Sequence, residues 1–232
     1  MMVGQADLLE GLRQMADREF VSLAPRLASD VVGCPQPVLV QHIRDAAIDA
    51  CERSLAWRYQ ITDVVTTGGK GGYQYDVPEH TDVHAIVDAL VGASSERVMQ
   101  RVFPVSNEVF LATYPGWPNT ETGTPRRITH LSAVSYALGP VPDGAYDIAM
   151  WVCLKPKRDA TGMDSVVFDD LETAIVHRAL QTLLVQSNKE WANQGMAAYH
   201  AKQYSFVISE RRARYNLGTP RATLIASCAT AV

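Results

Sequence analysis

Two segments with helical periodicity bracket a central segment of short β-prone runs, and this order restricts the folds open to the chain. A first helix is predicted from Pro37 to Arg58, because proline suits the first turn of a helix and apolar residues then recur at helical spacing. These apolar residues are Leu39, Ile43, Ala47, Cys51 and Leu55. One face of this helix therefore has to be covered by another part of the chain.

The second helical segment lies C-terminal to the β-prone runs. Asp169 and Glu172 have the spacing of a capping box at a helix start. A last helix is predicted from Gln194 to Tyr215, ended by Gly218 and Pro220. The apolar stripes comprise Leu171, Ile175, Ala179 and Leu183 in the first of these helices, and Ala197, Ala201, Tyr204, Ile208 and Tyr215 in the last.

Neither helical segment can bury its apolar stripe alone, so the two segments are expected to pair in space. The expected core pairing joins Leu39, Ile43, Cys51 and Leu55 to Leu171, Ile175, Leu183, Tyr204 and Ile208. The chain is therefore predicted to be an α+β protein. Its N-terminal and C-terminal helices form a helical core, an antiparallel β domain is inserted between them, and an extended arm ends the chain.

The β domain is predicted from the residues between Gln60 and Lys157. The β-prone runs are Ile61 to Thr67, Tyr73 to Val77, Val98 to Val102, Val109 to Thr113, Ile128 to Tyr136 and Tyr146 to Leu154. In the last run the bulky apolar residues fall on even positions, which predicts a strand with one face on the core. The predicted parts are residues 1–59, 60–158, 159–216 and 217–232.

The glycine-rich stretch from Val64 to Glu79 resembles a phosphate-binding loop at first sight. A P-loop needs glycine and a serine or threonine where this chain has Val64 and Gly71, so no nucleotide site is predicted. Glycines adopt positive φ without a steric penalty, and the stretch is instead predicted to be the turn of a β-hairpin.

Composition sets limits on the class of protein. With 232 residues, 47% hydrophobic and 20% charged, the chain can bury a core and fits one large or two small domains. No apolar run approaches the roughly 18 residues of a membrane span, and the N-terminus lacks the pattern of a signal peptide. We therefore expect cytoplasm-like conditions and no membrane partner.

Cysteine spacing and charge distribution add two further expectations. The four cysteines are far apart without a Cys-x-x-Cys pair, which argues against a zinc knuckle or a disulfide framework. Residues 1–169 have 14 Lys and Arg against 21 Asp and Glu, whereas residues 170–232 have 7 against 4. The two ends of the chain are therefore suited to different partners.

Residues that often carry chemistry are present but are not arranged as an active site. His80 and His84 have i, i+4 spacing, yet Pro78 precedes them and an extended segment follows, so no metal site is predicted. No motif places a nucleophile beside a base, and neither an enzyme nor a cofactor is expected. The single histidines His42, His177 and His200 are interpreted as residues at the edge of the core.

An arginine cluster stands near the end of the last predicted helix. Arg211, Arg212 and Arg214 could contact nucleic acid phosphates, but cations at a helix C-terminus also complement the helix dipole. Glu210 adjoins them, and a solvated or protein-interface role is the preferred interpretation.

Three stretches, taken in order, are similar to one protein family. The first is "VVGCPQPVLVQHIRDAAIDACERSLAWRYQI", the second is "PDGAYDIAMWVCLKPKRDATGMDSVVFDDLETAIVHRAL", and the third is "NKEWANQGMAAYHAKQYSFVISERRAR". Together they resemble the head-to-tail adaptor (connector) proteins of tailed double-stranded DNA bacteriophages and the related gene transfer agents. The resemblance covers most of the chain from Val31 to Arg214. The chain departs from the family pattern before Phe20 and in an irregular middle from Ser94 to Arg127.

The resemblance implies a structural virion protein and not an enzyme. Adaptors of this kind form a ring of usually twelve copies below the portal protein, at the head-tail interface of the virion, after assembly in the host cytoplasm. The ring extends the channel through which genomic DNA passes without sequence-specific binding, and it provides a platform for the next tail component, such as a nozzle, stopper or tail-tube protein. An overall negative charge suits a channel in which DNA slides.

The C-terminal segment from Gly218 to Val232 is predicted to be a docking arm. It carries no charge after Arg221, and its residues alternate with the period of a half-buried strand. The arm residues are Arg221, Ala222, Leu224, Ile225, Ala226 and Cys228. We expect it to add as a strand to a sheet edge of the portal, which agrees with the resemblance. The alternative is that this strand completes the chain's own β domain.

Two other functions stay open from the sequence. The chain could be another virion ring component, such as an upper tail-tube or nozzle protein, and the order of assembly with portal would separate the two. It could also be a glycan-binding virion module, since Tyr114 and Trp117 stand near Gly-Pro turns. Exposed aromatics are, however, equally common as anchors of protein interfaces.

Overall fold

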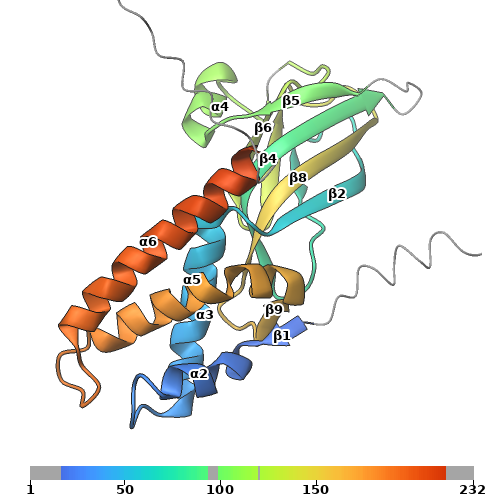
Figure 1. The fold of residues 1–232 in the computed structure, drawn as a ribbon. Coiled ribbons are helices and arrows are strands. Elements are labelled where there is room, and N and C mark those ends of the chain that lie inside the picture. Colours follow the sequence, from blue (N-terminus) through green and yellow to red (C-terminus); the bar gives the residue numbers. More distant parts are fainter. Residues whose placement is uncertain (1–16, 94–98, 120, 218–232) are drawn as a thin grey trace, which may run out of the picture.

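The computed structural model has an α+β fold, and it describes residues 17–93, 99–119 and 121–217 (Figure 1). The helical elements are η1 (Phe20–Leu23), α2 (Ala24–Ala28), α3 (Gln36–Ser54), α4 (Asn107–Thr113), α5 (Ser165–Leu184) and α6 (Gln194–Leu217). The strands are β1 (Asp17–Glu19), β2 (Arg58–Val65), β3 (Gly72–Gln74), β4 (Thr81–Ala93), β5 (Gln100–Pro104), β6 (Arg127–Ser132), β7 (Ser135–Gly139), β8 (Tyr146–Pro156) and β9 (Gly162–Asp164).

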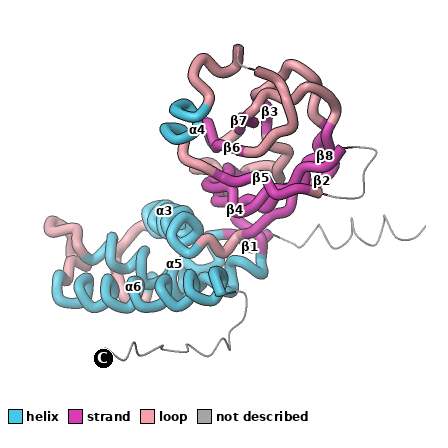
Figure 2. The backbone as a smooth tube through the Cα atoms, turned by 90° about the horizontal axis from the view of Figure 1, so that it is seen from above, coloured by secondary structure: helices cyan, strands magenta, loops and turns pink. Residues whose placement is uncertain are grey.

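The helices α3, α5 and α6 contact one another and lie to one side of the strands (Figures 1 and 2). We call these three helices the helical layer. Each helix turns an apolar stripe toward the others, and Ile43, Ile175 and Tyr204 are buried representatives of the three stripes. Burial of apolar area is the main term that holds these helices together, at about 25 cal/mol per Å².

A seven-stranded sheet forms the other part of the molecule, with the order β2-β8-β4-β5-β6-β7-β3. The antiparallel sheet that we expected is wrong in one respect, because β5 and β6 pair in parallel and the sheet is mixed. The connection from β5 to β6 runs through α4, and a parallel pair needs such a crossover. Figure 2 shows that the sheet curls. A separate two-stranded sheet pairs β1 with β9.

Strand β8 joins the sheet to the helical layer. It pairs with β2 on one side and with β4 on the other, and it also contacts α3. Ile148, Met150, Val152 and Leu154 are buried as predicted, while Trp151 on the other face is exposed. The alternation ends at Cys153, which also lies on the other face but is buried. Tyr146, at the start of the strand, is only half-buried.

Two helix boundaries differ from the sequence expectation. Helix α3 ends at Ser54 and not at Arg58, because Leu55 adopts the left-handed conformation with φ of 55°. Leu55 is half-buried and lies outside the apolar core that we expected it to join. Helix α5 begins at Ser165, where the carboxylate of Asp164 accepts a hydrogen bond from the Val167 amide, so the capping box at Asp169 is wrong.

Two of the predicted strand features are also wrong. Residues 107–113 form helix α4 and not a strand, because Ser106 caps the helix and Phe110 is fully buried. The glycine-rich stretch does not close a hairpin, since β2 pairs with β8 and β3 pairs with β7. Glycine is needed at position 71 for another reason: a Cβ atom there would lie 2.8 Å from the indole nitrogen of Trp117.

Candidate functional site

The residues of the expected core pairing fall mostly in one hydrophobic cluster. Its members from that set are Leu39, Ile43, Cys51, Leu171, Ile175, Leu183, Tyr204 and Ile208. Leu55 is the exception, for the reason given above. The docking-arm residues Arg221, Ala222, Leu224, Ile225, Ala226 and Cys228 lie outside the residues that the structure describes.

Asp49 ties the three helices together at the edge of that cluster. Its carboxylate, on α3, accepts a hydrogen bond from the Tyr204 hydroxyl on α6 and lies 3.2 Å from the Nε atom of Arg178 on α5. Arg53, one turn along α3, lies 3.1 Å from the other carboxylate oxygen. Burial and the hydrogen bond to Asp49 raise the pKa of Tyr204, so its hydroxyl remains a donor at all ordinary pH values.

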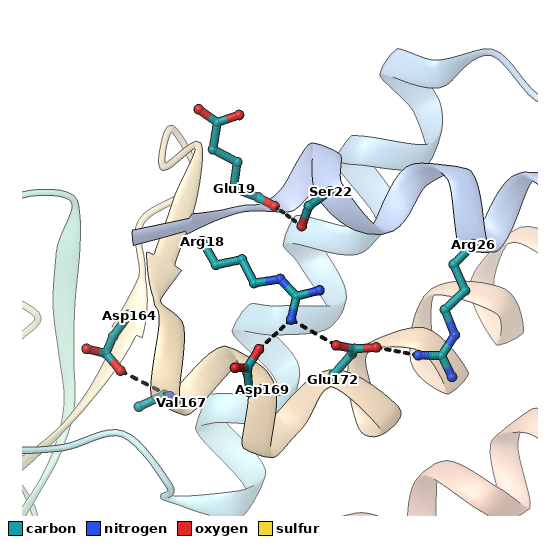
Figure 3. Close-up of polar contacts among 8 residues, drawn as sticks. All are labelled: Arg18, Glu19, Ser22, Arg26, Asp164, Val167, Asp169 and Glu172. Atoms are coloured by element: carbon teal, nitrogen blue, oxygen red, sulfur yellow. Dashed lines mark hydrogen bonds and ion pairs between the residues drawn. The ribbon is translucent and has the colours of Figure 1, made fainter. Parts of the chain in front are cut away.

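A second polar network fastens the N-terminal segment to α5 (Figure 3). The guanidinium of Arg18, on β1, donates to both Asp169 and Glu172, and its contact with Glu172 measures 2.9 Å. The other oxygen of Glu172 accepts a hydrogen bond from Arg26 on α2. The Arg18 guanidinium also lies over the Phe168 ring, 4.6 Å from its centroid. Glu172 therefore links two elements that precede α3 to the helical layer.

Two of the three arginines near the end of α6 form ion pairs with Asp170 within the same chain. Arg211 lies 2.6 Å from the carboxylate of Asp170 on α5, and the Tyr215 hydroxyl donates to the same carboxylate. Burial is the main cause that raises the pKa of Tyr215 to about 12. Arg214 lies 3.8 Å from Asp170, whereas Arg212 is exposed.

The end of α6 also reaches the sheet. Arg58, the first residue of β2, donates through Nη2 to the backbone oxygen of Tyr215 at 2.8 Å. Its guanidinium lies 5.9 Å from the centroid of the Tyr215 ring. The end of α6 therefore lies at the junction between the helical layer and the sheet.

The helical histidines are hydrogen-bonded within the helical layer. His42 contacts the Thr182 hydroxyl at 2.8 Å and the Gln186 amide at 3.0 Å. His177 and His200 approach each other with 2.9 Å between their Nδ1 atoms, so one ring donates and the other accepts. Burial lowers the pKa of all three, which keeps them neutral at pH 7.

The other two histidines of the sequence motif occupy different local structures. His80 lies in the turn before β4 with a positive φ of 58°, and His84 lies within β4. Among residues 17–93, 99–119 and 121–217, no group of three or more His, Cys, Asp or Glu side chains is arranged to hold a metal ion.

The aromatic residues considered for glycan binding pack against the protein. Trp117 is half-buried, donates its indole nitrogen to the Leu138 backbone oxygen at 3.1 Å, and meets the Phe110 ring edge-on. Tyr114 also packs on Phe110, with 5.2 Å between the ring centroids. Both rings are half-buried in these contacts, and Tyr114 also lines a surface pocket of about 510 Å³.

Two grooves follow α3 on the surface of the protein. The first, which we call the α3 groove, has a volume of about 780 Å³ and is lined by residues that include Glu19, Val21, Pro37, Val40, Arg44 and Asp45. The second, of about 620 Å³, contains acidic and basic side chains together, such as Glu52 and Lys155, which are 2.6 Å apart. Because its charges alternate in sign, the second groove does not provide the basic track that nucleic acid needs.

Large apolar side chains are exposed on α6. Tyr199 and Phe206 lie on the side of the helix that faces away from the helical layer, and Phe206 is 69% exposed. Met196 is also exposed, but it lines a pocket with Leu184 and His200. Lys202 lies between the two aromatic residues on the same side. We call Tyr199, Lys202 and Phe206 the α6 outer face.

Sequence reasoning missed the segment before α3. Phe20, Leu23, Leu27 and Val31 are all buried, and their spacing of three and four residues was a readable helical signal. The Arg18 contacts with Asp169 and Glu172 had no such signal, because the partners are 151 and 154 residues apart.

In the described ranges, no helix is both long enough and apolar enough to span a membrane. Comparison with known proteins returned no matching protein-family model and no matching curated protein.

Proposed function

We propose that the chain is a structural virion protein: a head-to-tail adaptor that forms a ring below the portal, extends the DNA channel and provides the platform on which the tail docks. One observation carries this proposal. The three stretches of sequence similar to adaptors supply α3, then β8 with α5, then α6. These are the elements that contact one another to form the helical layer and its link to the sheet.

The division of the molecule into a helical layer and a curled sheet supports two separate roles, one in the ring and one toward the tail. The helical layer is the part of the chain in which the resemblance is concentrated, and we assign to it the contacts within the ring and with portal. Strand β5 of the curled sheet and the helix α4 that follows it lie in the irregular middle of the sequence, where the chain departs from the adaptor pattern. We assign to the sheet the contact with the next tail component.

The C-terminal arm is the part to which we assign portal docking. The described chain ends at the junction between α6 and β2, which leaves 15 residues beyond α6. An extended strand rises about 3.3 Å per residue, so this length is sufficient to reach a neighbouring protein. Deletion of residues 219–232 should leave the melting temperature unchanged and abolish portal binding. If the truncated protein unfolds, the segment belongs to the chain's own sheet.

The test of the function is reconstitution with the portal protein of the same phage or gene transfer agent. We expect a complex whose mass corresponds to the portal plus a closed ring of this chain, and a ring density below the portal in particle images. The chain should bind portal before any tail component is added. If it binds only preassembled tails and never portal, it is a tail ring component such as a nozzle or upper tail-tube protein.

A further inference from the structure

Strand β2 forms the longer of the two edges of the seven-stranded sheet. Among the strands that the structure describes, β2 pairs with β8 alone and stands first in the sheet order. It has 8 residues, whereas β3 at the opposite edge has only 3. An edge strand presents backbone donors and acceptors to any further strand, and proteins usually shorten or cover such an edge. The edge of β2 is therefore the place at which another strand has room to add.

The apolar core of the sheet is incompletely covered at this edge. Tyr59 and Val64 of β2 pack against the core but are only half-buried. The residues opposite them on β8, Val152 and Ile148, are 0% and 2% exposed. This difference is expected, because β8 has a strand on each side and β2 has a strand on one side only. A further strand with apolar residues at alternate positions would bury the remaining surface of Tyr59 and Val64.

The end of α6 lies beside the first residue of β2. The Tyr215 backbone oxygen accepts a hydrogen bond from Arg58 at 2.8 Å, and α6 ends two residues later at Leu217. The C-terminal segment, residues 218–232, follows directly. In extended form its 15 residues span about 50 Å, whereas the 8 residues of β2 span about 26 Å. The segment therefore begins close to β2 and is long enough to follow its whole length.

The sequence of the C-terminal segment fits the open edge in length and in pattern. The stretch from Arg221 to Cys228 has the same number of residues as β2. Apolar residues stand at every second position of it, and these are Ala222, Leu224, Ala226 and Cys228. No charged residue follows Arg221, so nothing in the stretch opposes its insertion beside Tyr59 and Val64.

We infer that, in a copy that is not bound to portal, the C-terminal segment of the same chain adds to the open edge of β2 as a further strand of the sheet. This inference rests on the proposed function, because it gives the portal-docking arm a position before portal is met. The arm starts at the Arg58 end of β2 and runs parallel to it. The pairing of β2 with β8 is regular from Arg58 to Ile61 and shifts in register before Val64, so the arm pairs first along Arg58–Ile61. Portal then competes with β2 for the same strand.

This contact is compatible with an unchanged melting temperature after deletion of the arm. A strand that completed the sheet permanently would stabilise the whole protein, and its deletion would lower the melting temperature. A strand added at an edge opens locally, well below the temperature of global unfolding, so it is already detached when the protein melts. Hydrogen exchange at low temperature therefore measures the contact, and thermal unfolding does not.

Hydrogen exchange followed by mass spectrometry tests the contact in the full chain. The full chain is compared with the protein that lacks residues 219–232, on a peptide that covers Arg58–Val65. We expect the amides of this peptide that do not bond to β8 to exchange about tenfold more slowly in the full chain. Equal exchange in the two proteins would overturn the inference. Protection that increases with protein concentration would also overturn it, since the arm would then come from another copy.

A pair of double proline variants provides the matched comparison. Leu224→Pro with Ile225→Pro removes the backbone donors of two successive residues, one of which faces β2 in any register. This variant should exchange at the rate of the truncated protein. Thr230→Pro with Ala231→Pro lies beyond the stretch that pairs and should keep the slow rate of the full chain. If both variants exchange like the full chain, the arm does not pair with β2 as a strand.

The outcomes separate this inference from the proposed function. When portal is added, exchange of the β2 peptide in the full chain should rise to the rate of the truncated protein, and persistent protection on bound portal would refute the competition. If the arm protects β2 and the truncated protein still binds portal, the inference stands and the arm is not the portal-docking segment. If β2 exchanges equally with and without the arm while truncation abolishes portal binding, the inference is wrong and the adaptor function stands.

Discussion

The replacement of Ile175 by aspartate is the most direct test of the helical layer. Ile175 lies in α5, the helix that contacts both α3 and α6, and its side chain is 0% exposed. The change removes about 2 kcal/mol of apolar burial and places an unpaired carboxylate in an apolar site, which costs several kcal/mol more. Because a domain is stable by only about 5–15 kcal/mol, Ile175→Asp should unfold the protomer.

A graded variant measures the same site without complete unfolding. Ile175→Ala should cost about 2–5 kcal/mol, which includes the cavity that it leaves. For a chain of this size each kcal/mol lowers the melting temperature by about 2–4 °C, so we expect a decrease of about 4–20 °C. Thermal unfolding followed by circular dichroism measures this decrease, and size-exclusion chromatography shows whether the Ile175→Asp protein remains compact.

Val166→Asp provides the control on the same helix. Val166 is 54% exposed in the first turn of α5, where an acidic residue interacts favourably with the helix dipole. Its effect should stay within about 0.5 kcal/mol. If Ile175→Asp remains folded with an unchanged melting temperature, the packing of α5 between α3 and α6 is refuted.

Three further changes test other parts of the structure. Tyr204→Phe removes the hydroxyl that donates to Asp49 and should lower the free energy of unfolding by about 1–3 kcal/mol, which is measured as a lower melting temperature. An unchanged melting temperature would show that this hydrogen bond does not stabilise the helical layer. Burial lowers the pKa of His177 and His200, so the unfolded chain takes up protons first, and the melting temperature should fall as the pH drops from 7.5 to 5.5; a rise would contradict the burial of this pair. Gly139→Ala places a Cβ atom 2.3 Å from an aromatic ring and should destabilise by about 1–3 kcal/mol in chemical denaturation, whereas an unchanged midpoint would show that the ring moves freely.

The long helices could be predicted from the sequence because their signal is local and repeated. Ile43, Ile175 and Ile208 each belong to an apolar stripe with helical period, and all three are buried. The ends of the helices were harder to predict from the sequence. Leu55 stops α3 in a left-handed conformation that glycine usually provides, and leucine gives no sign of it.

The strand partners were the least predictable part of the fold. Alternation in β8 showed which face is buried, but no local pattern states that β8 pairs with β2 and β4. The run from Val109 to Thr113 has β-branched residues, and its helical state follows from the cap at Ser106 and the burial of Phe110.

The candidate surfaces were also hidden from the sequence. Phe206 appeared as one apolar residue among many in a helical segment, and only the packing of α6 shows that it points away from the protein. Val40 and Arg44 likewise form part of a groove because Glu19 and Val21, which are far away in the sequence, return to the same place. Such proximity depends on long-range contacts that have no periodic pattern.

The chain enters and leaves the sheet through neighbouring strands, and this has an evolutionary consequence. It departs from α3 at Ser54 and returns to the helices at Ser165, and Arg58 at the start of β2 pairs with Cys153 near the end of β8. An insertion whose two ends adjoin can be replaced as a unit with little strain on its host. Under the proposed adaptor function, recombination between phages would exchange the sheet for one suited to a different tail, while the helices would keep their contacts with portal and with neighbouring copies. Among relatives of this chain we expect the sequence between Ser54 and Ser165 to diverge faster than the helices on either side.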